Sequence, residues 1–148
     1  MIFLKGEAMS TTIRPELSIN GKYYVEKHRY YELKHFCLQY PLWKKTLTSL
    51  GEAKYVRTDI SSVYVKGIFS DPTADHAEEK IFYSERVRMI EDTVKQTAPE
   101  PIANYLLRGV TEGVSYEYLK AKLNIPCCRD KYYELYRKFF YLLSIERQ

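Results

Sequence analysis

The chain has 148 residues, 45% of them hydrophobic, and a net charge of +4. This length suits one compact domain or two small helical units that share a core. No apolar run reaches the ~18 residues of a membrane span, and the apolar start at residues 1–5 is too short for a secretory signal. The three cysteines are an odd number and two are adjacent, so we expect a reduced, cytoplasmic protein without a disulfide framework.

Charge is distributed unevenly along the chain. Residues 21–58 carry eight Lys/Arg against three Asp/Glu, residues 59–103 carry five against nine, and residues 104–148 carry eight against five. Two basic ends around an acidic middle fit a protein with a basic contact surface and a separate face for itself or another protein. Ordinary solvated helix faces produce the same pattern, so charge alone does not decide the function.

The first half of the chain predicts a Tyr-rich, basic helical unit over residues 21–70. We expect residues 1–20 to be disordered. Apolar positions recur at spacings of three, four and seven from Lys22 to Gln39, which predicts a helix. A shorter helix is expected through Trp43. Two short strand-like runs within residues 52–68 indicate a loop or a small β-hairpin.

The second half, residues 71–148, predicts one long helix and several short ones. Pro72 at a first helical position begins a helix that should run to about Thr97. Pro101 begins a short helix, which we expect Gly109 to end as a C-terminal cap. Ser115 is a natural N-cap for the helix after it. The expected fold is therefore mainly α, a helical domain with its functional signal at the C-terminal end.

That signal is a pair of helices joined by a tight turn. An amphipathic pattern over Tyr116–Leu123 stops at Asn124-Ile125-Pro126, and a longer basic helix pattern follows over Cys128–Leu143. This is the helix-turn-helix layout, whose second helix can enter the major groove of DNA. A helical hairpin with a merely solvated basic face is the alternative. The residues expected to contact DNA are Arg129, Lys131, Tyr133, Arg137 and Lys138.

A family resemblance adds to this pattern. The Asp71-Pro72-Thr73-Ala74 start, the long helix and a helix-turn-helix similar to region 4 of sigma factors resemble the RinA/ArpU-type late transcriptional regulators of phages and prophages, over about residues 71–144. The resemblance implies sequence-specific binding of double-stranded DNA in the host cell cytoplasm, activation of phage late genes and no enzymatic activity. Cys127-Cys128 departs from the family, in which Ser or Thr is usual before the recognition helix.

Two other classes of protein stay open at this point. A small phage-encoded protein that binds and inhibits a host protein, such as an anti-CRISPR inhibitor, would use the Tyr-rich half, because tyrosine gives a large contact area at low entropy cost. A small terminase subunit would bind DNA as a homo-oligomeric ring. A regulator would instead contact RNA polymerase or a second copy of itself. The candidate partner-binding residues are Tyr23, Tyr24, Lys27, Tyr31, Lys34 and Trp43.

The sequence carries no catalytic or metal-binding motif. The histidines are scattered, and the cysteines lack the Cys-x-x-Cys spacing of zinc sites. A Gly-rich phosphate loop and a nucleophile elbow are both absent from the sequence. We therefore expect no metal, no cofactor and no enzymatic activity.

Overall fold

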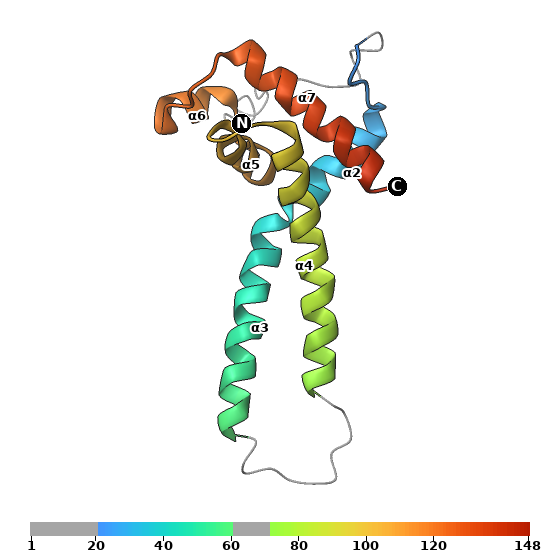
Figure 1. Cartoon of the computed structure of the whole chain (residues 1–148), viewed down its shortest axis with the longest axis vertical. Coiled ribbons are helices and arrows are strands. Elements are labelled where there is room, and N and C mark those ends of the chain that lie inside the picture. The colour runs from blue at the N-terminus through green and yellow to red at the C-terminus, as the bar shows by residue number, and fades with distance from the viewer. Residues whose placement is uncertain (1–20, 61–71) are drawn as a thin grey trace, which may run out of the picture.

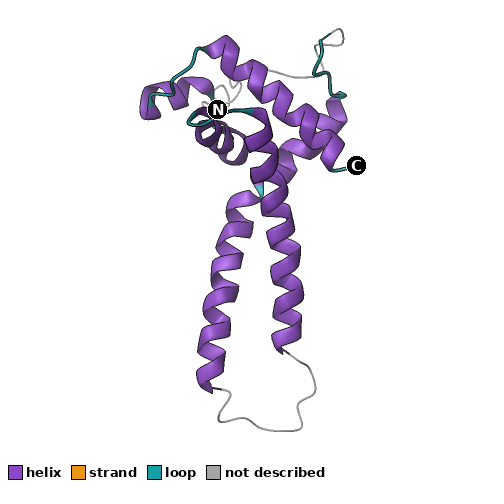
Figure 2. Ribbon diagram, in the orientation of Figure 1, coloured by secondary structure: helices purple, strands orange, loops and turns teal. Residues whose placement is uncertain are grey.

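The computed structural model describes residues 21–60 and 72–148, and every regular element within these ranges is an α-helix (Figure 2). The prediction of a mainly α fold is therefore confirmed. The expected disorder of residues 1–20 lies outside the described residues. The helices are α2 (Lys27–Leu38), α3 (Tyr40–Ile60), α4 (Pro72–Thr97), α5 (Ile102–Glu112), α6 (Tyr116–Leu123) and α7 (Arg129–Glu146).

A helical head carries a projecting two-helix hairpin (Figure 1). The head consists of α2, α5, α6, α7 and the C-terminal end of α4. The projecting hairpin is formed by α3, which leads away from the head, and by the first turns of α4, which return antiparallel to it. Glu91 of α4 holds the hairpin closed near the head. The Tyr40 hydroxyl donates to the Glu91 carboxylate at 2.5 Å, and Lys44 Nζ lies 3.5 Å from the same oxygen.

The small hairpin expected within residues 52–68 does not form in its first half. α3 continues to Ile60, so the strand-like pair Tyr55-Val56 is helical. The second strand-like run, residues 63–65, lies outside the described residues. Strand propensity in a two-residue run is a weak preference, and the helix that begins at Tyr40 continues through it.

One hydrophobic core joins the two halves of the chain. Tyr30 and Leu33 of α2 and Phe139 and Phe140 of α7 are all fully buried within it. The Tyr30 and Phe140 rings meet edge to face at 5.1 Å between centroids. Burying each such side chain contributes about 1.5–3 kcal/mol. α2 from the first half of the chain therefore packs directly against α5 and α7 from the second half.

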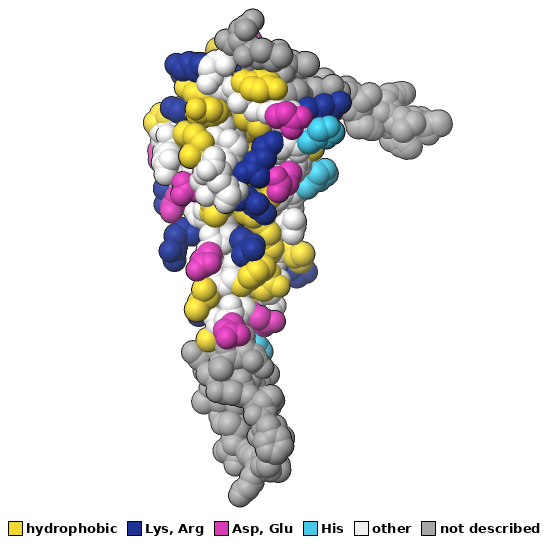
Figure 3. Space-filling view, turned by 90° about the vertical axis from the view of Figure 1, so that its right-hand side faces the viewer, with side chains coloured by type: hydrophobic (Ala, Val, Ile, Leu, Met, Phe, Trp, Pro, Cys, Tyr) yellow, Lys and Arg dark blue, Asp and Glu magenta, His cyan; other side chains and the backbone are white. Residues whose placement is uncertain are grey.

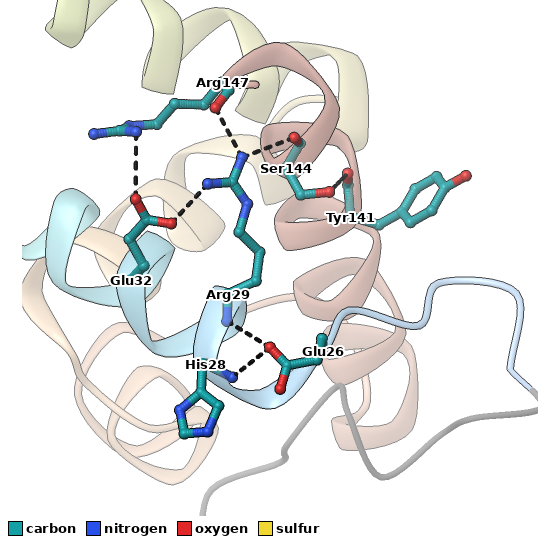
Figure 4. A network of polar contacts seen from close by, with 7 residues as sticks. All are labelled: Glu26, His28, Arg29, Glu32, Tyr141, Ser144 and Arg147. Carbon is teal, nitrogen blue, oxygen red and sulfur yellow. Dashed lines mark hydrogen bonds and ion pairs between the residues drawn. The ribbon is translucent and has the colours of Figure 1, made fainter.

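α2 also holds the C-terminal end of α7 through polar contacts (Figure 4). The Arg29 guanidinium donates to the backbone carbonyls of Ser144 at 3.0 Å and Arg147 at 2.7 Å, and it pairs with Glu32 at 2.6 Å. The Arg147 side chain lies 3.7 Å from the same carboxylate. The last carbonyls of a helix have no partner within it, so Arg29 satisfies groups that would otherwise need water.

Gly109 lies inside α5 and does not end it, so its expected role as a C-terminal cap is wrong. Gly113 takes that place in the left-handed conformation, with φ 72°. A Cβ at Gly109 would stand 1.9 Å from the Tyr132 hydroxyl oxygen of α7. A glycine is needed at position 109 because α7 approaches the backbone of α5 there, not because of a turn.

Candidate nucleic-acid interface

α6 and α7 form the predicted pair of helices, with well-defined ends. The Ser115 side chain accepts a hydrogen bond from the Tyr118 amide at 3.2 Å, so the expected N-cap is confirmed. Asn124 ends α6 in the left-handed conformation, with φ 55° and ψ 52°, and its amide donates to the carbonyls of Leu119 and Lys120. Asparagine is one of the few residues that adopt this conformation at low cost.

The connection between the two helices spans residues 124–128, so α7 begins one residue after the predicted start at Cys128. Ile125 within it is fully buried, which anchors the turn in the core. Two hydrogen bonds of Tyr116 brace the pair. Its amide donates to the Tyr133 hydroxyl at 3.2 Å, and its own hydroxyl donates to the Cys127 carbonyl at 2.7 Å. The angle between α6 and α7 is therefore held by buried contacts on both sides of the turn.

The prediction that Tyr133 lies on the contact face is wrong. Its side chain is only 9% exposed. The ring meets those of Tyr132 and Tyr136 edge-on, at 5.0 and 5.7 Å between centroids. The inward stripe of α7 is therefore wider than the sequence pattern indicated. The Tyr133 hydroxyl accepts the hydrogen bond from the Tyr116 amide and so takes part in the fold.

Arg129 is exposed but already holds a partner. Its Nε donates to the Glu117 carboxylate of α6 at 2.9 Å, and its guanidinium lies 5.1 Å from the centre of the Tyr133 ring. This hydrogen bond lowers the pKa of the Glu117 carboxyl below its ordinary value. An exposed ion pair of this kind is weak. Arg129 is therefore available to an anion, but it also contributes to bracing α6 against α7.

The other predicted cations of α7 lie at the surface to differing degrees. Lys131 is exposed, with its Nζ 3.7 Å from Glu134 in the next turn. Arg137 and Lys138 are half-buried. Their long apolar stems can pack against the protein while their charged ends reach solvent.

Sequence reasoning missed Lys120 and Lys122 in the last turn of α6. Both are exposed, and within the described part of the chain neither has an ion pair. The signal in the sequence that could have identified them is the pair of lysines in the last turn of this helix, directly before Asn124. The Lys120 side chain is exposed to solvent, whereas Leu119 beside it is fully buried in the core. We define the basic surface as Lys120, Lys122, Arg129, Lys131, Arg137 and Lys138.

The N-terminus of α7 opens onto the same region. Cys128 is the N-cap residue, and its side chain makes no capping hydrogen bond. The amides of the first turn of a helix point outward and carry a partial positive charge, so this end favours an anion. Three carboxylates, Glu117, Asp130 and Glu134, lie among the six cations of the basic surface, so the net charge of the region is +3.

The candidate partner-binding residues do not form one surface. Trp43 is only 5% exposed and packs edge-on against Phe36 at 5.0 Å between ring centroids, so the prediction that it binds a partner is wrong. Tyr23 is half-buried against Tyr141 of α7, at 5.7 Å between centroids. The others lie on or just before α2, where Tyr24 and Lys27 are exposed and Tyr31 and Lys34 half-buried.

Among residues 21–60 and 72–148, no three His, Cys, Asp or Glu side chains lie close enough together to hold a metal ion. None of the helices in these ranges combines the length and the apolar character needed to cross a membrane. Comparison with known proteins found no matching family model, no matching curated protein and no matching solved structure.

Proposed function

We propose that this protein binds double-stranded DNA through the basic surface and acts as a phage-type transcriptional regulator. The observation that carries the proposal is the exposed cationic end of a braced helix pair. Lys120 and Lys122 stand there without an ion pair to any described residue, beside the N-terminus of α7, whose N-cap side chain makes no capping hydrogen bond. The role in transcription rests on the resemblance of residues 71–144 to RinA/ArpU-type regulators.

In this proposal the N-terminal half of α7 lies in the major groove. Lys120, Lys122 and the first amides of α7 bind phosphates and set the register, while Lys131 and Arg137 reach toward base edges. The Tyr116 hydrogen bonds and the buried Ile125 keep α6 and α7 at a fixed angle, which lowers the entropy cost of docking. The protein is a binding protein rather than an enzyme, and its second contact is RNA polymerase.

Fluorescence anisotropy on a random duplex pool at two salt concentrations tests this proposal. Lys122→Glu with Lys131→Glu should weaken binding by at least ~100-fold, because two phosphate contacts become repulsive. Lys80→Glu with Lys95→Glu is the matched control, since both are exposed cations on α4 outside the basic surface and the net charge changes by the same amount. Arg129 is a poorer choice, because its hydrogen bond to Glu117 braces α6 against α7 and its reversal would disturb the angle between the two helices. Equal affinity in all variants, or no binding at low salt, would refute the proposal.

The host-protein inhibitor is the second candidate, favoured by the exposure of Tyr24 (37%) and of Lys27 at the start of α2. An inhibitor would lose its activity on Tyr24→Ala with Lys27→Glu and keep it on Lys122→Glu with Lys131→Glu. The regulator should show the reverse. A small terminase subunit would bind DNA as a ring, which a molar mass several times that of one chain would reveal.

A further inference from the structure

The two broad faces of the projecting hairpin differ in character. The stripe between the helices takes positions 43, 47 and 50 of α3 and positions 83, 87 and 90 of α4. In an antiparallel pair, residues one position before the inward stripe project to the same face from both helices. Residues one position after it project to the opposite face. The Lys44–Glu91 ion pair joins two such residues, which agrees with this assignment.

The face formed by the preceding positions is almost uncharged. We call it the hairpin face: Leu42, Thr46, Ser49, Phe82, Arg86 and Met89. Leu42 is 61% exposed and Phe82 46% exposed. The single charge among these six residues is that of Arg86, whose guanidinium carbon lies 3.5 Å from the centre of the Phe82 ring and which donates to the Phe82 carbonyl. Hydrophobic side chains are also visible among the charged ones along the projecting part of the molecule in Figure 3.

We propose that a second copy of this chain packs against the hairpin face, so that two hairpins form a four-helix bundle. Charges that flank the hairpin face argue for this occupant, since exposed Lys45 lies beside it on α3 and exposed Glu78 and Glu85 lie beside it on α4. The net charges of the two helices have the same signs. α3 has four Lys/Arg against two Asp/Glu, a net charge of +2, and α4 has four against six, a net charge of −2. A surface with one cationic and one anionic helix side by side is complementary to a second copy of itself related by a two-fold rotation.

The same charges select the symmetry axis. A two-fold axis parallel to the hairpin places α3 against α4 of the partner copy, so each contact joins helices of opposite net charge and opposite direction. An axis across the hairpin would place α3 against α3 and α4 against α4, with like charges facing. The parallel axis leaves both heads at the same end of the dimer. If the proposed DNA binding holds, two α7 helices are then available for two half-sites.

The first test is the molar mass of the full chain without DNA, measured by light scattering after size exclusion and by sedimentation over about 1–100 µM. The wild type should be a dimer. Leu42→Glu with Phe82→Glu should raise the dimer dissociation constant by at least ~100-fold, because two carboxylates would be buried in an apolar contact. Both side chains are exposed in the single chain, so far-UV circular dichroism should be unchanged. Ile145→Glu, which alters a 50% exposed residue of the head, should stay dimeric.

A crosslinking experiment tests the arrangement. Ser49 lies five residues along α3 from Lys44, and Arg86 lies five residues back along α4 from Glu91, so both stand at one level of the hairpin. One chain carries Ser49→Cys and a second chain carries Arg86→Cys, each with the native cysteines replaced, and the two chains are mixed. Crosslinks should join unlike chains. A wild type that is monomeric throughout, a dimer insensitive to the double glutamate variant, or crosslinks mainly between like chains would overturn the proposal. These results are independent of DNA binding.

Discussion

The closest approach between two helices gives the sharpest test of the packing that positions α7. Replacing Gly109 by alanine would put a Cβ 1.9 Å from the Tyr132 hydroxyl oxygen and 3.2 Å from the ring carbon that bears it. A comfortable contact is about 3.5 Å, so α5 and α7 would have to separate by more than ~1 Å or the tyrosine would have to leave its rotamer. The Tyr132 hydroxyl is buried and, within the described residues, has no hydrogen-bond partner.

The magnitude follows from two opposing effects. Overpacking a dense core costs about 1–3 kcal/mol, and a contact this short lies at the upper end of that range. Replacing glycine by alanine inside a helix contributes about 1 kcal/mol in the other direction. We therefore expect Gly109→Ala to lower the free energy of unfolding by ~2 kcal/mol. In a Tyr132→Phe background the clashing oxygen is gone, and the same change should be nearly neutral.

Urea unfolding followed by far-UV circular dichroism measures all four chains of this cycle. Tyr132→Phe alone should be neutral or stabilising, because it removes a buried hydroxyl without a partner. Gly51→Ala is the matched control, since no atom lies within 4 Å of its added Cβ, and it should stabilise α3 by about 0.5–1 kcal/mol. An equal cost of Gly109→Ala in both tyrosine and phenylalanine backgrounds would refute the reasoning.

Three further predictions concern other parts of the head. Arg29→Ala should lower the free energy of unfolding by about 1–3 kcal/mol in urea titrations, because two carbonyls of α7 lose their donor; a loss no larger than that of Lys27→Ala would contradict it. Asn124→Gly should be neutral or stabilising and Asn124→Ala destabilising by about 1 kcal/mol, owing to the left-handed backbone; the reverse order of thermal midpoints would exclude this. Burial raises the pKa of the Tyr132 and Tyr136 hydroxyls above the ordinary value of about 10. Folding thus retains these two protons, so stability in urea titrations should hold below pH ~10 and fall above it, and the fall should be smaller in a chain with Tyr132→Phe and Tyr136→Phe; an equal fall in both chains would argue against it.

Local sequence signals predicted the helices well where the signals are strong. Pro72 and the helical pattern after it predicted the position of α4, and Ser115 predicted the beginning of α6. The signals failed where tertiary contacts decide. Gly109 lies near the end of a short helical pattern, where a glycine often acts as the C-terminal cap. Its role depends instead on Tyr132, 23 residues later in the chain. No local pattern contains that information.

The contact residues show the same division. Arg129 and Lys131 were predicted from helical spacing and are exposed at the beginning of α7. Tyr133 was expected at the surface because of its helical spacing from Arg129 and Arg137, and Trp43 as part of the Tyr-rich unit, yet each is buried against other aromatic rings. The width of a buried stripe depends on how many helices surround it. α7 is packed by α2, α4, α5 and α6, which spacing along one helix cannot reveal.

The central claim is that DNA contacts the turn between α6 and α7, and a two-dimensional NMR titration of the labelled protein with a short duplex tests it most directly. Amide shifts should change in residues 120–131 and along the exposed side of α7, and stay unchanged in the projecting part of α3. Lys122→Glu with Lys131→Glu should abolish these changes without altering the spectrum of the free protein elsewhere. Shifts confined to α2, or none at low salt, would contradict the account.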